Sequence, residues 1–183
     1  FNVSNIEAVN AIYNVAKKLN VPVIIGVSEG EEDFIGANNI ANIVKGIREK
    51  DNYPIFLNAD HHYTFERVKN VLDVGFDSAI IDGVKLPIEE NISLARKCIE
   101  YSKNINREVL IEGEIGFIGQ SSKILDKIPE GVSEETMTKP EDAKYFTEQT
   151  GVDLLSASVG NIHGMIKGGN PKIDIERIKE IKK

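Results

Sequence analysis

Short apolar runs alternate with helical patterns along almost the whole chain, and this alternation limits the fold more than any other feature. Val23 to Val27 is one such run, bounded by Pro22 and by Ser28-Glu29-Gly30. No hairpin turn sequence joins two runs, so we expect helices to link consecutive strands and the strands to lie parallel. The expected strands are 1–3 (the end of a strand), 23–27, 55–59, 78–81, 109–111 and 154–159. The expected helices are about 5–19, 37–50, 64–74, 87–102, 140–150 and 175–183, the first with Ser4 as N-cap in a capping box with Glu7.

The number of strands indicates the architecture. A complete (β/α)8 barrel needs about 250 residues, so six strands in 183 residues fit a barrel that lacks its last quarter. We therefore predict an α/β fold, a (β/α)8 TIM barrel truncated to about six βα units. Residues 1–183 are expected to form a single barrel domain, incomplete at both ends, and residues 117–139 an irregular active-site loop or insertion. An open doubly wound sheet is the alternative, but no G-x-G-x-x-G pattern follows the first strand, which disfavours its dinucleotide-binding version.

Composition excludes several classes of partner. The net charge is −7 and no block of Lys or Arg occurs, which argues against a surface for nucleic acid or an anionic membrane. No apolar run approaches the length of about 20 residues that spans a bilayer. The one cysteine, Cys98, allows no internal disulfide and fits a reducing compartment, so we expect a cytoplasmic protein.

Polar side chains follow nearly every expected strand. They are Asn2, Ser28, Asp60 with His61 and His62, Asp82, Glu114, and Asn161 with His163. A single polar residue at a strand end is as often a solvated turn as a site. In a barrel, however, these ends converge on one mouth, and so many together predict a functional site there. Imidazoles combined with carboxylates are typical ligands of a divalent cation of the zinc type.

Other chemistries have less support. No G-x-S-x-G elbow occurs, which argues against an acyl-transfer hydrolase, and no lysine ends a strand, which leaves a Schiff-base mechanism without a nucleophile. The segment Gly164 to Gly169 contains one cation, Lys167. Such a loop either turns its backbone N–H groups toward a phosphate or forms a flexible surface turn.

The chain resembles the class II, metal-dependent fructose-bisphosphate aldolase family. The resemblance holds in order and spacing over nearly the whole sequence outside residues 117–139. The matching segments are Phe1-Asn2-Val3-Ser4-Asn5, Val21 to Ile24 with Ser28-Glu29-Gly30, Asp60-His61, Gly75-Phe76, Ile81-Asp82-Gly83, Leu86-Pro87 with Glu89-Glu90-Asn91, Glu112 to Gly116, and Gly160 to Gly164 with Lys167.

The resemblance implies a role for each matching residue. His61 and His163 match two ligands of a catalytic Zn²⁺, and Asp60 matches the catalytic acid/base residue beside it. The carboxylates Asp82 and Glu114 match positions that bind a second, weaker divalent or monovalent cation. The expected substrate contacts, with a small sugar phosphate, are Asn2, Ser28, Gly164 and Lys167. The full-length form is expected to be a homo-oligomer that binds neither nucleic acid nor a membrane.

Three departures from the family pattern are visible. A third zinc histidine, in a His-Gly-Gly segment, is expected beyond Lys183. The family's mobile loop carries a glutamate that moves a proton, whereas Gly119-Gln120-Ser121-Ser122-Lys123 has no carboxylate, and Glu130, Glu134 and Glu135 are the candidate substitutes. His62 stands where the family has a small residue, and it is interpreted as a spare ligand, a specificity residue or a hydrogen-bonded bystander.

The resulting functional hypothesis is a zinc-dependent aldolase of carbohydrate metabolism and glycolysis. It would reversibly cleave a ketose 1,6-bisphosphate, by default fructose 1,6-bisphosphate, to dihydroxyacetone phosphate and glyceraldehyde 3-phosphate. The alternatives are an aldolase for tagatose bisphosphate or a shorter sugar phosphate, a non-catalytic relative that binds metal or sugar phosphate, and a metal-dependent isomerase or other lyase.

Overall fold

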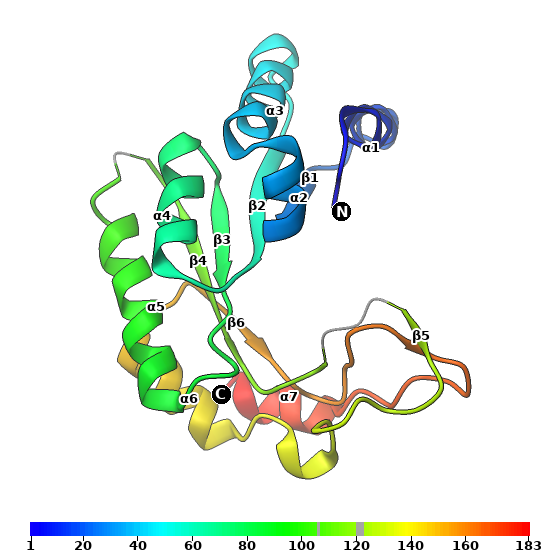
Figure 1. The fold of residues 1–183 in the computed structure, drawn as a ribbon, viewed down its shortest axis with the longest axis vertical. Coiled ribbons are helices and arrows are strands. Elements are labelled where there is room, and N and C mark those ends of the chain that lie inside the picture. The colour runs from blue at the N-terminus through cyan, green and yellow to red at the C-terminus, as the bar shows by residue number, and fades with distance from the viewer. Residues whose placement is uncertain (106, 120–122) are drawn as a thin grey trace. The chain divides into compact units, whose positions relative to one another are not determined.

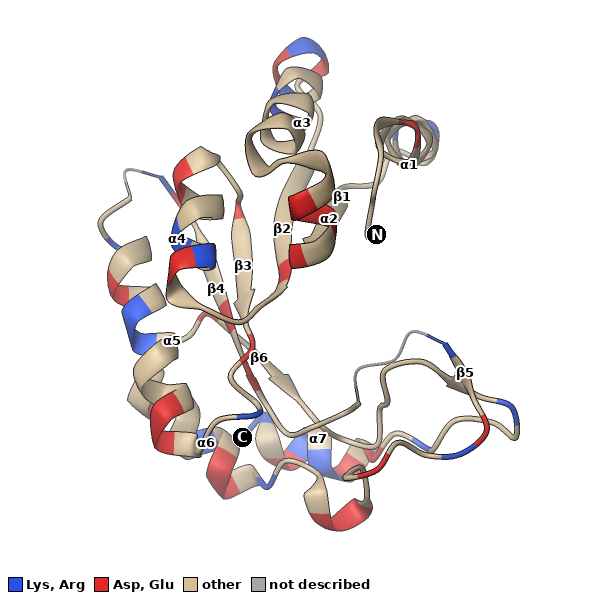
Figure 2. Cartoon of the chain, viewed as in Figure 1, with Lys and Arg blue, Asp and Glu red and all other residues tan. Residues whose placement is uncertain are grey.

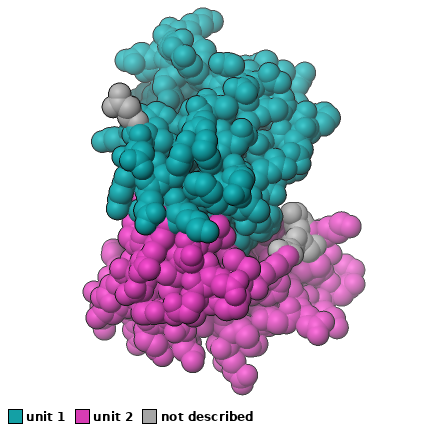
Figure 3. All heavy atoms as spheres, turned by 60° about the vertical axis from the view of Figure 1, so that its left-hand side comes forward, with its two compact units in different colours: residues 1–82, 97–112 teal, residues 83–96, 113–183 magenta. Residues whose placement is uncertain are grey.

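Figure 1 shows the computed structural model, which describes residues 1–105, 107–119 and 123–183. Parallel strands alternate with helices along the chain, which confirms the predicted α/β fold. The chain divides into two compact units: residues 1–82 with 97–112, and residues 83–96 with 113–183 (Figure 3). Within the described ranges, no helix has both the length and the apolar character that a membrane crossing needs.

Three adjacent parallel strands form the sheet of the first unit. They are β1 (Val23–Ser28), β2 (Ile55–His62) and β3 (Ser78–Ile81), in that order. The register pairs Val23 with Ile55 and, at the other end, Ser28 with Asp60. The first residue of β4 (Leu110–Ile115) extends this sheet, because its N–H donates to the carbonyl of Asp77 at 3.1 Å. The expected strand end at 1–3 is an isolated parallel bridge between Asn2 and Gly26.

The helices of the first unit bury one face of this sheet. They are α1 (Ile6–Leu19), α2 (Glu29–Ile35), α3 (Ala37–Asp51) and α4 (Phe65–Val74), with the end of α5 (Ile88–Ser102). Ile25, Leu57 and Leu72 are at most 1% exposed, and each such side chain contributes about 1.5–3 kcal/mol by burial. On the other face, Ile24 and Phe56 stay about half exposed, so β1 and β2 have a covered and an open face.

Two features of the first unit differ from the sequence prediction. The N-cap of α1 is Asn5, not Ser4, since the Asn5 side chain accepts the hydrogen bond from the Ala8 amide. Helix α2 was not predicted at all. It begins directly after β1, where Ser28 and Glu31 form a capping box.

The second unit contains the start of α5, the end of β4, and β6 (Leu154–Ala157), which is the neighbour of β4 in the sheet. Helix α6 (Pro140–Thr150) contacts both β6 and α7 (Ile175–Ile181). Strand β6 is two residues shorter than predicted. The expected irregular stretch at 117–139 contains β5 (Ile124–Leu125) and a 3-10 turn, Glu134–Thr136. Strand β5 pairs in parallel with β7 (Met165–Ile166), so part of the predicted glycine loop is extended.

Candidate metal and acid/base site

The end of β2 carries three consecutive polar side chains, Asp60, His61 and His62, and the local backbone conformation points them in different directions. The strand was predicted to end at Ala59 but continues to His62, with an irregular register against β3 between these two residues. His61 has a positive φ of 48°, a conformation that costs a non-glycine residue about 1–3 kcal/mol. As a result the His61 side chain stays 25% exposed, whereas that of His62 is fully buried at 0%.

His61 lies against the carboxylate that follows the neighbouring strand. Its Nδ1 is 3.1 Å from Oδ2 of Asp82, whose side chain is only 6% exposed. On the other side of the ring, Nε2 is 3.9 Å from Oδ1 of Asp60. The first unit thus brings together three predicted site residues from the ends of two strands. The imidazole of His61 beside the carboxylate of Asp82 offers ligand types that suit a cation of the zinc type, and Asp60 lies next to this pair.

Asn2 also belongs to this group. Its Nδ2 donates to Oδ2 of Asp60 at 2.6 Å. The Asn2 side chain lies directly over Gly26, where a Cβ would be 2.4 Å from the Asn2 Oδ1. A glycine at position 26 therefore lets Asn2 reach Asp60, and Asn2 orients that carboxylate in addition to any contact with substrate.

Ser28 stands beside Asp60 in the register of β1 and β2 but is engaged as a helix cap. Its hydroxyl donates to Oε2 of Glu31 at 2.9 Å and accepts from the Glu31 amide at 3.4 Å. Its own backbone N–H donates to the same carboxylate at 2.8 Å. The side chain predicted as a substrate contact thus has a local structural role in this structure.

His62 points away from the other two side chains and contacts α2. Its Nε2 lies 2.8 Å from Oε2 of Glu32, which is 5% exposed. Sequence reasoning missed Glu32, because α2 was not predicted. The signal was present in the sequence: Ser28-Glu29-Gly30-Glu31 is a capping-box pattern, which marks the start of a helix. In Figure 2 much of the ribbon of this short helix has the red colour that marks Asp and Glu.

The other predicted site residues belong to the second unit. Glu114, near the end of β4, is 4% exposed, and its backbone carbonyl accepts from Nδ2 of Asn91 at 2.9 Å. The backbone N–H of His163 donates to the carbonyl of Ile118 at 2.8 Å. Gly164 follows with a φ of 109°, which favours glycine. Lys167 lies further along, with its Nζ 2.5 Å from Oδ1 of Asp126.

The structure describes only part of the segment Gly119 to Lys123, where the family's mobile loop carries a glutamate and this chain has no carboxylate. Residues 120–122 lie outside the described residues, so the departure at Gly119 to Lys123 has no structural outcome. Of the candidate substitutes, Glu134 and Glu135 lie in the 3-10 turn and Glu130 precedes it.

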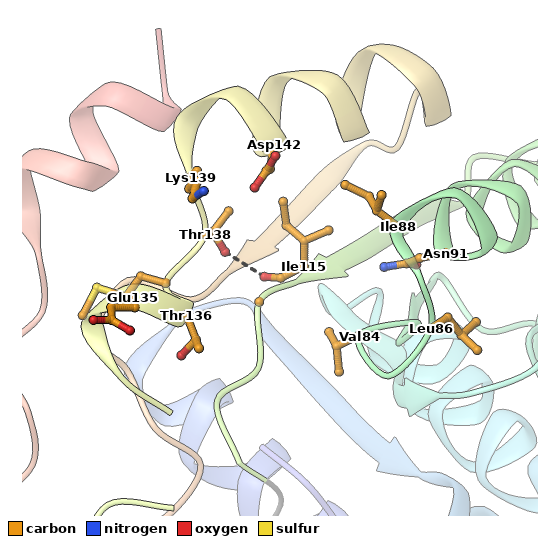
Figure 4. A pocket seen from close by; sticks show the side chains of 12 residues that line it. Val84, Leu86, Ile88, Asn91, Ile115, Glu135, Thr136, Thr138, Lys139 and Asp142 are labelled. Carbon is orange, nitrogen blue, oxygen red and sulfur yellow. Dashed lines mark hydrogen bonds between the residues drawn. The ribbon is translucent and has the colours of Figure 1, made fainter. Parts of the chain in front are cut away.

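A cavity of about 240 Å³ also lies in the second unit. Figure 4 shows Val84, Leu86 and Ile88 on one side and Thr136, Lys139 and Asp142 on the other. Thr138 and Ile115 also line the cavity, and the hydroxyl of Thr138 donates to the carbonyl of Ile115 at a distance of 2.9 Å. Glu135, one of the candidate substitutes, lines this cavity, whereas Glu114, His163, Gly164 and Lys167 are not among the lining residues. We therefore assign the cavity no part in the metal and acid/base site.

The sequence model of the family described as "Fructose-bisphosphate aldolase class-II" matches residues 1–183. The chain belongs to this family. It is 34% identical to a fructose-bisphosphate aldolase from Geobacillus stearothermophilus and 33% identical to one from Staphylococcus epidermidis. These matches cover 100% and 99% of the chain, but only 62% of each relative, so the chain spans less than two thirds of their length.

Solved aldolase structures share the fold. The YdjI aldolase from Escherichia coli K12 superposes with a TM-score of 0.78 at 23% identity, over 100% of this chain and 60% of that one. A fructose-bisphosphate aldolase from Campylobacter jejuni gives a TM-score of 0.73 at 24% identity, over 99% and 57%. At these identities the similarity establishes the fold, and the resemblance to class II aldolases inferred from the motifs is confirmed by the family match.

Proposed function

We propose that the protein containing this chain is a zinc-dependent class II aldolase that reversibly cleaves a ketose 1,6-bisphosphate. Fructose 1,6-bisphosphate is the proposed substrate, and dihydroxyacetone phosphate and glyceraldehyde 3-phosphate are the products. The observation that carries the proposal is the cluster of Asp60, His61 and Asp82 at the ends of two adjacent strands in a chain of this family.

The proposed metal ligands within this chain are His61 and His163, with a third histidine elsewhere in the protein. His61 supports this fit, because its side chain is 25% exposed and lies beside Asp82 and Asp60. A zinc ion held there would supply Lewis-acid chemistry at the ketone oxygen of a substrate. Asp82 and Glu114, both buried carboxylates, are proposed to hold a second, weaker cation, as the resemblance to the family implies.

Asp60 is the proposed acid/base residue. It would take the proton from the hydroxyl at the carbon whose bond breaks and return it in the condensation direction. The hydrogen bond from Asn2 fixes one carboxylate oxygen. The other oxygen, Oδ1, faces the His61 ring and is the one proposed to exchange the proton.

Gly164 and Lys167 are proposed to bind a phosphate of the substrate. A glycine with positive φ can turn backbone N–H groups toward an anion, and Lys167 supplies a cation. Lys167 would first exchange its ion pair with Asp126 for the phosphate. Both side chains of that pair are largely exposed, at 66% and 84%, so the exchange has a small cost. Asn2 and Ser28 are the other proposed substrate contacts, and a homo-oligomer in the cytoplasm is the proposed working form.

A substrate panel tests this proposal. The zinc-loaded protein is incubated with fructose 1,6-bisphosphate, tagatose 1,6-bisphosphate and a shorter ketose phosphate, and release of dihydroxyacetone phosphate is measured with a coupled dehydrogenase. Cleavage of the fructose compound supports the proposal. Faster cleavage of either other sugar would replace the substrate but keep the mechanism. Zinc binding without cleavage of any of them would favour a non-catalytic relative.

A further inference from the structure

The residue that follows the proposed zinc ligand is itself held by a buried contact. The His62 side chain is fully buried, and its Nε2 is 2.8 Å from Oε2 of Glu32 on α2. A carboxylate oxygen is the acceptor in such a pair, so we assign the donated hydrogen to Nε2 of the imidazole. In a buried environment of low dielectric this hydrogen bond is stronger and more directional than in water.

Helix α4 fixes the Glu32 carboxylate in turn. Nδ2 of Asn70 donates to its other oxygen, Oε1, at 3.2 Å, and Nη1 of Arg67 lies 3.5 Å from the same atom. With Oε1 engaged by α4, Oε2 is left directed at His62. The contact therefore connects the end of β2 to two helices that pack beside it.

The backbone around His62 is fixed as well. Its carbonyl accepts from the N–H of Asp82 at 2.9 Å, and the N–H of Tyr63 donates to Oε1 of Glu29 at 3.0 Å. His62 is thus held at its ring, at its carbonyl and at the following amide. His61, immediately before it, has the positive φ of 48°. Such a conformation persists only where the surrounding structure over-determines it.

We propose that Glu32 is a positioning residue, which acts through His62 to keep the His61 backbone in its left-handed conformation. In this conformation the His61 ring faces Asp82 and would be available to a cation held at this site. The carboxylate of Glu32 is engaged by His62, Asn70 and Arg67, so we assign it a positioning role and not a ligand role. Only the effect on the cation rests on the proposed function; the effect on the His61 backbone does not.

Three variants of the whole protein separate positioning from packing. Glu32→Leu removes the hydrogen bond, and Glu32→Gln keeps a side chain that can still accept from Nε2–H. The control is Asp33→Asn on the same helix. Asp33 is bound to the same Arg67 at 2.7 Å, and its side chain is 60% exposed. Its hydrogen bonds are with Arg67 and not with His62.

The first measurement uses metal-free protein without substrate. The ¹³Cα and ¹³Cβ chemical shifts of His61 report the sign of its φ, and deuterium exchange of the Asp82 amide reports the hydrogen bond to His62. Glu32→Leu is expected to move the His61 shifts toward extended values and to speed the Asp82 exchange about tenfold. Glu32→Gln and Asp33→Asn are expected to resemble the wild type.

The second measurement titrates Zn²⁺ alone against a competing chelator. Loss of a residue that orients a ligand weakens metal binding about 10–100-fold, and we expect Glu32→Leu to raise the dissociation constant within that range. Glu32→Gln should stay near the wild type. If Glu32→Leu does not fold, the double variant Glu32→Leu/His62→Phe replaces the buried pair with apolar side chains, which often restores stability. It should still show the altered His61 shifts.

Unchanged His61 shifts and Asp82 exchange in Glu32→Leu, or in the double variant, would overturn the proposal. Equal changes in Asp33→Asn would also overturn it, because the effect would then be a general one of α2. The chemical shifts need neither metal nor substrate, so a failure of ketose bisphosphate cleavage would count against the proposed function and leave this inference standing.

Discussion

The proposed acid/base residue depends on a side chain that is absent at Gly26. Asn2 reaches Asp60 only because no Cβ stands at position 26, and the hydrogen bond at 2.6 Å then fixes the carboxylate. The orientation of the Asp60 carboxylate therefore depends on the bridge between Asn2 and Gly26, which places the start of the chain against β1.

Gly26→Ala is expected to damage both stability and activity. The added Cβ would overlap Asn2, and overpacking of this kind costs about 1–3 kcal/mol. The displaced Asn2 would release Asp60, so kcat should fall more than KM rises. Gly46→Ala is the matched control. Nothing lies within 4 Å of a Cβ there, and glycine to alanine inside helix α3 should raise the free energy of unfolding by about 0.5–1 kcal/mol. Denaturant unfolding measures both, and equal effects would contradict the argument.

Asp60→Asn tests the proposed proton transfer. The amide keeps the shape but cannot act as a base, so kcat is expected to fall about 10²–10⁴-fold while bound zinc, measured by atomic absorption, stays near the wild-type amount. Asp73→Asn, which alters an exposed pair with Lys69, is the control and should retain activity. Loss of zinc from Asp60→Asn in step with the loss of activity would instead make Asp60 a residue of the metal site.

For individual residues, the sequence predicted the positions of the site residues along the chain better than it predicted their contacts. Asp60, His61 and Asp82 follow apolar runs, and that pattern alone placed them at strand ends. The pairs of Asn2 with Asp60 and of His62 with Glu32 join residues 58 and 30 positions apart, so no local pattern encodes them.

The N-terminus of α1 corrects the sequence prediction in a measurable way. Asn5→Ala removes the side chain that accepts from the Ala8 amide and is expected to lower the free energy of unfolding by about 1 kcal/mol. Ser4→Ala should change it by less than about 0.5 kcal/mol, since Ser4 lies outside the cap. Denaturant unfolding with both variants decides between the two caps, and a larger loss from Ser4→Ala would restore the capping box predicted from the sequence.

Cys98 reports the integrity of α5. Burial raises the pKa of its thiol from 9.0 to about 12, with a smaller contribution from Glu66. We therefore expect iodoacetamide at pH 8 to label it only after unfolding. Because the folded pKa is the higher one, unfolding releases a proton above about pH 9, and the free energy of unfolding should decrease from there upward. Rapid labelling of the native protein would contradict the burial of this helix face.

The alternation of strands and helices was predictable because buried parallel strands read as apolar runs and their caps carry local signals, such as Thr64 before α4 and Gly75 after it. Helix α2 was missed although the capping-box pattern of Ser28 and Glu31 marks its start, because its seven residues are mostly acidic and show no apolar period. The extension of β2 to His62 depends on the irregular register against β3, which is a tertiary effect.

For the whole molecule, the family is established and the activity is the claim to be tested. The chain spans 62% of the curated relatives it matches. The proposed ligand set includes a histidine outside this chain, so the test requires the protein that contains it.

The most direct test is a zinc titration of chelator-treated protein. Zn²⁺ is added in steps, and bound metal and cleavage of fructose 1,6-bisphosphate are measured on the same samples. The account predicts no cleavage in the metal-free protein and a rate that rises in proportion to bound zinc, up to one catalytic ion per chain. Full zinc binding with no cleavage of any ketose bisphosphate, or cleavage that persists without metal, would contradict it.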